Sequence, residues 1–342
     1  MLSPSRPHPR LDQLRVVASL TEEIRDLSHL RELVERFEDA GVDGVSVGDH
    51  LFGGSPSGPN GYEARSEPFT VLAAVLALSG RLEVGTLVAN VGFEHPALLL
   101  RHFQQLAVLG GGARVLAGIG AGWQADEFRA IGLGAPMFRS RMERLEETLV
   151  LARQLWGTGR ANFSGRQVVV EDLPLSPRPD VAPRLMVGGG SERLLVLAGR
   201  YADHVDLMGS SRRTVVGAQS SSLAEAGRRL ATTVGDLEEA NRAVDAAALT
   251  AGRNPRVIAR SVYFDTIRIV DDAETAAMEA SICMSQGVPR RALSQCPYVL
   301  VGSRDTILAK VKDRVDRLGL SAVFVQAPAA MTFCTDVLGR GA

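Results

Sequence analysis

The sequence predicts an α/β protein of the (β/α)8 class, a TIM barrel with insertions at its rim. Eight short apolar segments, typical of buried parallel strands, alternate strictly with helical segments. The chain of 342 residues has the length of one large α/β barrel, and no break in composition marks a linker. These features favour the barrel over a doubly wound sheet with a second domain. We expect one domain over residues 1–342, with a flexible N-terminal segment at 1–12.

The first elements set the pattern that the rest of the chain repeats. A strand is expected at 14–18. A helix is expected at 21–40, because its apolar residues recur at helical spacing, and Gly41 supplies a helix end. The apolar run at 44–48 is bounded by glycines, which is typical of a buried parallel strand.

Helix and strand then alternate through the middle of the chain. The apolar run at 69–78 predicts a helix and is followed by a strand at 82–88. The next helix, 96–109, begins at a proline, which suits the first helical position, and a strand follows at 114–119. A long helix is expected at 139–156.

The same alternation completes the barrel. The remaining strands are expected at 184–187, 204–208, 257–264 and 322–326, and the helices between them at 192–201, 223–251 and 306–318. The insertions that would enlarge the rim lie at 51–68, 157–183 and 272–302, with a small hairpin at 167–170.

Composition and short motifs exclude several function classes. With 38 basic and 39 acidic residues the net charge is −1, so the chain lacks the basic surplus that nucleic-acid binding needs. The three cysteines have no C-x-x-C spacing, and no H-E-x-x-H or G-x-S-x-G motif occurs. The apolar run at 69–78 is too short to span a bilayer. We expect a cytoplasmic protein with no metal, no membrane contact and a small-molecule substrate.

The expected strand ends show where chemistry belongs, because a barrel of this class carries its site at the C-terminal ends of the strands. Polar, glycine-rich and aromatic residues gather there, at 49–50, 87–90, 120–123, 188–191, 209–213 and Gln326. Such groups suit a planar cofactor that carries a phosphate. Backbone N–H groups at the start of the helix 192–201 would form a phosphate site.

An ordered set of motifs resembles the bacterial luciferase-like superfamily, and most of all its branch of oxidoreductases that use the deazaflavin coenzyme F420. The motifs are Asp49-His50 after the strand at 44–48, Gly85-Thr86 with His95-Pro96 beyond it, Gly118 to Trp123 with Glu127, the helix 141–156, and Gly188 to Gly190 followed by Ala198 to Asp203. The resemblance covers residues 14 to 330. It implies a TIM barrel that holds F420 or FMN at its C-terminal face, and a homodimer.

The resemblance also implies cofactor contacts. In relatives, a strand bulge, often with a non-prolyl cis peptide, backs the ring, and by position this is Leu87–Val88. Further contacts are implied for Asp49, Asn90, Ala121, Gly122, Trp123, Gly189, Gly190, Ser191, Ser210 and Arg212. Arg212 is preferred to Arg213 because relatives place a basic residue near that point. For Asp49, the alternative is a structural cap of the loop that follows.

Two residues are candidates for proton transfer. His50 could protonate the substrate as hydride arrives, or it could only hydrogen-bond the cofactor. Some deazaflavin-dependent relatives carry a glutamate acid where this chain has Trp123, so that acid cannot be transferred to this position. Glu127 could replace it as a catalytic group or serve as a helix-capping acid.

The resemblance leaves three functions open. The leading expectation is hydride transfer from reduced F420 to a small organic substrate, with His50 as the acid. The second is a two-component monooxygenase that uses reduced FMN from a separate reductase together with O2. The third is a non-catalytic barrel that acts as a subunit partner.

Overall fold

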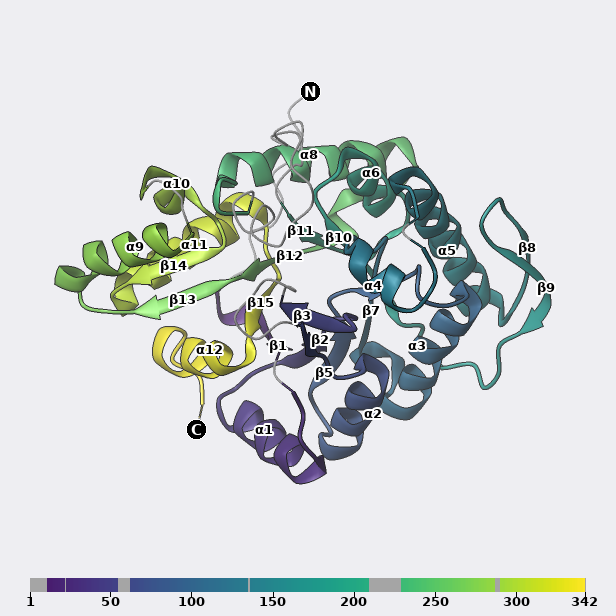
Figure 1. The fold of residues 1–342 in the computed structure, drawn as a ribbon, viewed down its shortest axis with the longest axis horizontal. Coiled ribbons are helices and arrows are strands. Elements are labelled where there is room, and N and C mark those ends of the chain that lie inside the picture. The colour runs from purple at the N-terminus through teal and green to yellow at the C-terminus, as the bar shows by residue number, and fades with distance from the viewer. Residues whose placement is uncertain are drawn as a thin grey trace.

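The computed structural model describes residues 11–21, 23–54, 62–134, 136–208, 229–286 and 290–341. Within this part of the chain, eight parallel strands close into a barrel, which confirms the predicted fold class (Figure 1). In order around the barrel they are β1 (Arg15–Leu20), β2 (Gly44–Val47), β5 (Glu83–Thr86), β7 (Val115–Gly120), β10 (Arg184–Gly189), β11 (His204–Leu207), β12 (Ala259–Phe264) and β15 (Ala322–Gln326). β15 pairs with β1 and closes the ring.

Helices surround the strands, because each strand is buried on both faces and needs apolar cover on its outer side (Figure 1). They are α1 (Leu27–Asp39), α2 (Pro68–Leu78), α3 (Pro96–Gly110), α5 (Phe138–Thr158), α6 (Glu192–Tyr201), α8 (Val234–Thr250) and α11 (Arg304–Leu318). None of the helices in the described ranges is long and apolar enough to cross a membrane.

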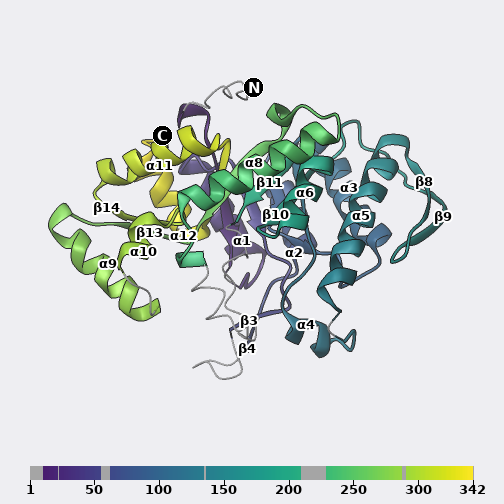
Figure 2. The ribbon, with the colours of Figure 1, turned by 90° about the horizontal axis from the view of Figure 1, so that it is seen from above.

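Additional elements enlarge the rim. The hairpin of β3 (Phe52–Gly54) and β4 (Tyr62–Ala64) and the short helix α4 (Ala125–Ala130) lie on the same side of the barrel (Figure 2). After β12 the chain forms a small parallel pair with its own helices. The elements of this insertion are β13 (Thr266–Ile269), α9 (Asp272–Gln286), α10 (Arg290–Gln295) and β14 (Val299–Gly302). The chain ends in α12 (Ala327–Thr332) and a π-helix at Phe333–Val337.

The structure corrects several predicted boundaries. The first helix begins at Leu27 rather than at residue 21, because the Asp26 side chain accepts the His29 N–H and caps the helix there. The helix expected at 223–251 is α8, which begins at Val234. A capping box between Thr233 and Asp236 sets that start. Residues 223–228 of the expected helix lie outside the described residues.

The hairpin in the 157–183 insertion is longer than the predicted one at 167–170. It pairs β8 (Arg160–Ser164) with β9 (Val169–Pro174). Its turn is held by Glu147 on α5, whose carboxylate accepts the backbone N–H groups of residues 166 to 168. A contact with a distant helix therefore decides the extent of this hairpin. At the N-terminus, Leu11–Gln13 form a short 3-10 helix.

Apolar side chains fill the barrel interior beneath the C-terminal ends of the strands. Val17, Leu116, Met186 and Phe324 form a buried cluster, and the half-buried side chains of Leu87, Val88 and Tyr263 pack against it. The strand register places these residues on the inner face, because paired residues of parallel strands point to the same side of a sheet. Leu87, Val88 and Tyr263 therefore form the upper surface of the interior packing.

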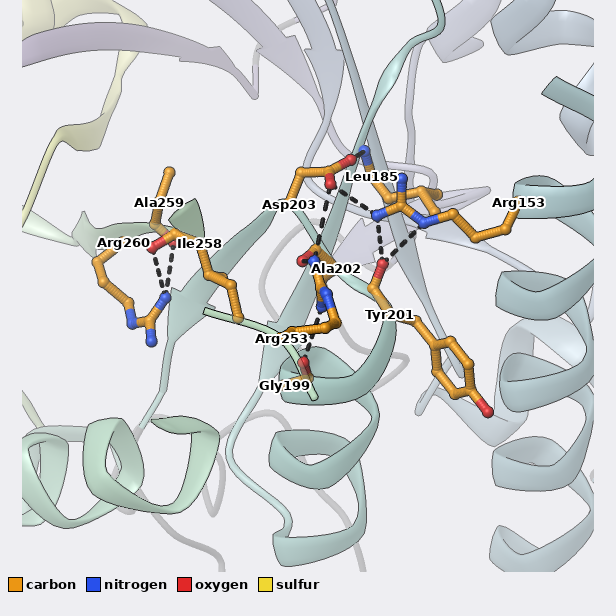
Figure 3. A network of polar contacts seen from close by, with 10 residues as sticks. All are labelled: Arg153, Leu185, Gly199, Tyr201, Ala202, Asp203, Arg253, Ile258, Ala259 and Arg260. Carbon is orange, nitrogen blue, oxygen red and sulfur yellow. Dashed lines mark hydrogen bonds and ion pairs between the residues drawn. The ribbon is translucent and has the colours of Figure 1, made fainter. Parts of the chain in front are cut away.

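Hydrogen bonds from arginine side chains stabilise the other end of the barrel, where the strands begin (Figure 3). Asp203, just before β11, accepts the Leu185 N–H at 2.9 Å and the Arg153 guanidinium at 2.6 Å. Arg253 donates to the carbonyl oxygens of Gly199 and Ala202, both at 2.7 Å. These bonds satisfy backbone groups at the end of α6 and tie that helix to β10.

Candidate active site

The site residues gather at the C-terminal ends of the barrel strands. His50 follows β2 and Trp123 follows β7, which lies two strands further around the barrel. β11 is four strands from β2 in either direction, so it lies across the barrel from His50. We call the space between these strand ends the mouth.

His50 and Glu127 form a direct pair. Glu127 lies on α4, and its carboxylate oxygens are both 3.1 Å from His50 Nδ1. It also accepts the Leu51 backbone N–H at 2.7 Å and is only 1% exposed, whereas the His50 side chain is 39% exposed. A carboxylate acceptor at Nδ1 fixes the ring proton there, which leaves Nε2 as the nitrogen that can serve a ligand.

The structure gives Glu127 a contact that neither suggested role includes, and its catalytic role stays a prediction. Its side chain is buried and lies against His50. Its carboxylate also reaches the loop after β2 instead of capping its own helix. The geometry gives it a positioning role, because it holds the histidine ring and the first residue of the following loop.

Trp123 stands beside this pair. Its ring meets the His50 ring edge-on, with centroids 6.0 Å apart, and it is 43% exposed. Gly122 has φ +68°, and a Cβ there would meet the Asn90 side chain at 2.4 Å. Arg141 on α5 donates to the Gly122 carbonyl oxygen, and Ala121 packs against the hydrophobic core. The loop after β7 is thus fixed in a conformation that suits glycine.

Asp49 and Asn90 join two neighbouring strand ends. Asp49 Oδ2 accepts the Asn90 backbone N–H at 2.8 Å, and Asn90 Oδ1 accepts the Gly92 N–H at 2.9 Å. Burial raises the pKa of the Asp49 carboxyl to about 6, although the bond from Asn90 opposes this shift. This bond reaches a neighbouring strand end rather than the loop that follows Asp49, so it differs from the cap that the sequence left open, and the cofactor contact of Asp49 stays a prediction.

The bulge expected beside the cofactor is present between β5 and β6 (Ala89–Asn90). The Leu87–Val88 peptide bond is cis, at the position that the resemblance indicated. Val88 projects between two glycines of the inner face. A Cβ on Gly120 would meet Val88 Cγ2 at 2.5 Å, and a Cβ on Gly188 would meet Val88 Cγ1 at 3.3 Å.

These residues give the mouth a flat apolar floor, which we call the Val88 platform (Val88, Gly120 and Gly188). Glycine at both flanking positions allows the valine to lie low between the strands. A platform flanked by glycines, without side chains beside it, fits a planar ring.

Predicted phosphate-binding residues lie at the end of β10 and just after it. Gly189 ends β10 with φ +145°, and Gly190 leads to Ser191, the N-cap of α6. The Ser191 side chain accepts the Leu194 N–H at 3.3 Å, and Glu192 begins the ten-residue helix. The positive end of that helix dipole faces the mouth side of β10, as a phosphate group would require.

The far side of the mouth carries polar residues that sequence analysis missed. Tyr263 on β12 hydrogen-bonds with Ser19 and Gln326, and burial raises its pKa to about 12. Asp206 on β11 accepts the Ser261 hydroxyl at 2.7 Å, and burial raises its pKa to about 6. Tyr263 and Asp206 occupy inward-facing positions of strands that were predicted as buried. Polar residues at such positions were the one sequence signal that could have identified them.

The structure brings most of the predicted site residues to one mouth. Ser210 and Arg212 lie outside the described residues, as does Arg213. The described residues contain no group of histidine, cysteine, aspartate or glutamate side chains arranged to hold a metal ion. Cys283, Cys296 and Cys334 are all buried and free.

Comparison with known proteins identifies one family over most of the chain and individual relatives over about half of it or less. The model of the luciferase-like monooxygenase family matches residues 11–321. An F420-dependent glucose-6-phosphate dehydrogenase of Amycolatopsis mediterranei (strain U-32) is 31% identical over 179 residues, 51% of this chain and 52% of that protein. Pyrimidine monooxygenase RutA of Pseudomonas syringae pv. syringae (strain B728a) is 31% identical over 145 residues, 42% of this chain and 40% of that protein. The matched segments thus span about half or less of these curated relatives.

Solved structures share the fold at low identity. An F420-dependent secondary alcohol dehydrogenase in complex with an F420-acetone adduct superposes with TM-score 0.69 and 18% identity, over 95% of this chain and 97% of that one. The monooxygenase RslO1 from Streptomyces bottropensis has the same TM-score and identity, over 95% and 99%. At this identity the likeness establishes the barrel fold alone.

Proposed function

Because this chain belongs to the luciferase-like monooxygenase family, we propose that it is an oxidoreductase that transfers hydride from reduced F420 to a small organic substrate. The observation that carries the proposal is the His50–Glu127 pair at the edge of the Val88 platform. A proton-transfer group held by a buried carboxylate beside a flat apolar floor suits hydride chemistry, which must be coupled to a proton.

The residues present fit the cofactor. The Val88 platform would lie under the ring, and Gly189, Gly190 and Ser191 would hold the phosphate at the start of α6. Reduced F420, when bound, supplies the hydride. Asp49, Asn90 and the loop from Ala121 to Trp123 would border the ring. Ser210 and Arg212 remain proposed phosphate contacts on the basis of sequence.

In this proposal His50 moves the proton. Glu127 holds Nδ1 and so directs Nε2 toward the mouth, where a protonated ring donates to the substrate as hydride arrives. Trp123 excludes water from one side of the imidazole by its edge-on contact. Glu127 acts through His50 and does not touch the reacting atoms.

The alternative is a two-component monooxygenase that uses reduced FMN and O2. The pyrimidine monooxygenase relatives favour it, and the platform and phosphate site would accept FMN equally. This alternative requires a separate flavin reductase as partner. In either case we propose a cytoplasmic homodimer with no nucleic-acid partner.

The first experiment is equilibrium binding of the full chain to FMN and F420, each oxidised and reduced, followed by fluorescence. Micromolar or tighter binding of F420 alone supports hydride transfer, and a preference for reduced FMN favours O2 chemistry. Failure to bind either cofactor would refute both and restore the non-catalytic barrel.

The second experiment tests the proton donor. We expect His50→Ala to lower kcat by about 100- to 10,000-fold, the usual contribution of a general acid, and to leave cofactor affinity nearly unchanged. His102→Ala is the matched control. His102 also faces a glutamate, Glu94, at 3.4 Å, but it lies on α3 at the outside of the barrel. An equal loss in both variants would contradict the role of His50.

A further inference from the structure

A buried arginine on the far side of the mouth takes no part in the proposed proton transfer. Arg229 precedes α8, and its Nε donates to Asp265 Oδ2 at 2.9 Å. Its guanidinium carbon is 4.4 Å from the ring centroid of Tyr298 and 5.9 Å from that of Tyr263. A carboxylate and two aromatic rings therefore fix this guanidinium in place.

One nitrogen of this group is left unpaired. Nη2 of Arg229 is buried and has no hydrogen-bond partner within the described ranges of the chain, and the side chain as a whole is 18% exposed. A buried donor on a charged group is costly to leave unsatisfied. The N–H groups of Nη2 are therefore suited to an acceptor that the described residues do not supply.

The location of Arg229 places that acceptor on the substrate side. Asp265 directly follows β12, and Tyr263 on β12 packs against the buried cluster of the barrel interior, so Arg229 lies at the mouth. The proposed cofactor position uses β5, β7 and β10. Because β11 lies across the barrel from β2, Arg229 and His50 belong to opposite sides of the mouth, and the Arg229 side lies away from the proposed cofactor strands.

The surrounding charges select the kind of acceptor. Arg229 and Asp265 form an ion pair, so together they carry no net charge. Asp206, a second carboxyl, is close enough to interact electrostatically with Arg229. An added anion would meet two carboxyl groups for one guanidinium. A neutral oxygen would instead gain the hydrogen bond without that repulsion.

We propose that Arg229 is a substrate-binding residue whose Nη2 donates a hydrogen bond to a neutral carbonyl or amide oxygen of the substrate. The inference rests on the proposed function, because the cofactor position there defines the substrate side. It assigns to this chain an uncharged carbonyl compound, held between Arg229 and His50. Sugar phosphates and other anions would be disfavoured.

The test uses three small probes of similar shape and the full chain. Binding of cyclohex-2-en-1-one, cyclohex-1-ene-1-carboxylate and cyclohexene is measured by saturation-transfer NMR titration, with and without oxidised F420. The variant is the double substitution Arg229→Gln with Asp265→Asn, which removes both charges of the ion pair together, so that neither partner is left as an unpaired ion.

We expect the ketone to bind the wild-type chain more tightly than the carboxylate or cyclohexene. The double variant should weaken ketone binding about 10- to 100-fold, as for loss of one hydrogen bond from a charged donor, and leave F420 affinity within about twofold. The matched control is Arg260→Gln with Asp245→Asn. It removes another arginine–aspartate ion pair, 2.8 Å apart, whose arginine is buried outside the mouth, and it should leave ketone affinity unchanged.

Four results would overturn the proposal. They are no ketone binding by the wild-type chain, equal ketone affinity in wild type and double variant, tighter binding of the carboxylate, and an equal loss in the control variant. Loss of F420 affinity in the double variant would assign Arg229 to the cofactor instead. Failure of the wild-type chain to bind F420 refutes the proposed function separately, because the ketone titrations without cofactor still report on Arg229.

Discussion

Replacing Asp206 by asparagine should stabilise the protein at neutral and alkaline pH. The carboxyl is 2% exposed inside the barrel, where Ser261 donates to it at 2.7 Å, and burial raises its pKa from 3.8 to about 6. The native state thus holds a proton that the unfolded chain releases between these values. The free energy of unfolding therefore falls as pH rises through the interval from about 4 to about 6.

The size of the effect follows from the two pKa values. At 1.36 kcal/mol per unit, the raised pKa of Asp206 lowers the free energy of unfolding by about 3 kcal/mol above pH 7 and by about 1 kcal/mol at pH 4.5. Asparagine keeps an oxygen for the Ser261 hydroxyl and never ionises. We therefore expect Asp206→Asn to gain up to about 3 kcal/mol at pH 8 and about 1 kcal/mol at pH 4.5.

The assay is urea unfolding of wild type and variant at both pH values, compared at equal m values. Asp203→Asn is the control with the opposite sign. Its carboxylate accepts Leu185 N–H and Arg153, so the substitution should lower stability at pH 8. Two results would contradict this reasoning: no gain in the free energy of unfolding at pH 8, or a gain for Asp206→Asn that does not change with pH. Either would show that burial does not make ionisation of Asp206 costly.

Three further predictions concern the mouth and the barrel interior. Glu127→Gln should lower kcat at least tenfold, because Nδ1 of His50 loses its carboxylate partner, while the Kd for the cofactor changes little. An unchanged kcat would contradict the positioning role of Glu127. Gly120→Val should weaken cofactor binding more than tenfold in a fluorescence titration, because its side chain would displace Val88, whereas Gly235→Ala, with only Thr233 Oγ1 at 3.6 Å, should not. Burial holds the pKa of His204 well below 6.5, so the unfolded state takes up a proton first as the pH falls. The free energy of unfolding should therefore fall by about 1.4 kcal/mol per pH unit below pH 6.5. His204→Leu should remove this slope in urea unfolding, and a slope that persists would belong to other groups.

The site was predictable where it depends on strand order. Once strands alternate with helices, every strand end belongs to one face, so His50, Trp123 and Gly189 could be placed together before any contact was known. The resemblance in motif order also indicated that the cis peptide bond lies at Leu87–Val88. The role of Glu127 was not predictable, because its carboxylate reaches His50 across 77 positions of sequence.

Arg229 shows the same limit more clearly. Its partner Asp265 is 36 positions away, and Tyr298 comes from the insertion after β12. In the sequence, each of these residues is an ordinary charged or aromatic residue that indicates no site by itself. Their convergence, and the donor left unpaired by it, exist only when β12 and β14 have been brought together.

The sequence by itself determined the eight strands, the helices between them and the face that carries the site, because apolar spacing, glycines and prolines act on neighbouring residues. The tertiary structure alone decided how far the β8–β9 hairpin extends and which buried polar groups meet at the mouth. Those outcomes depend on contacts between segments that are distant in sequence. Such contacts form only when closure of the barrel fixes the segments relative to one another.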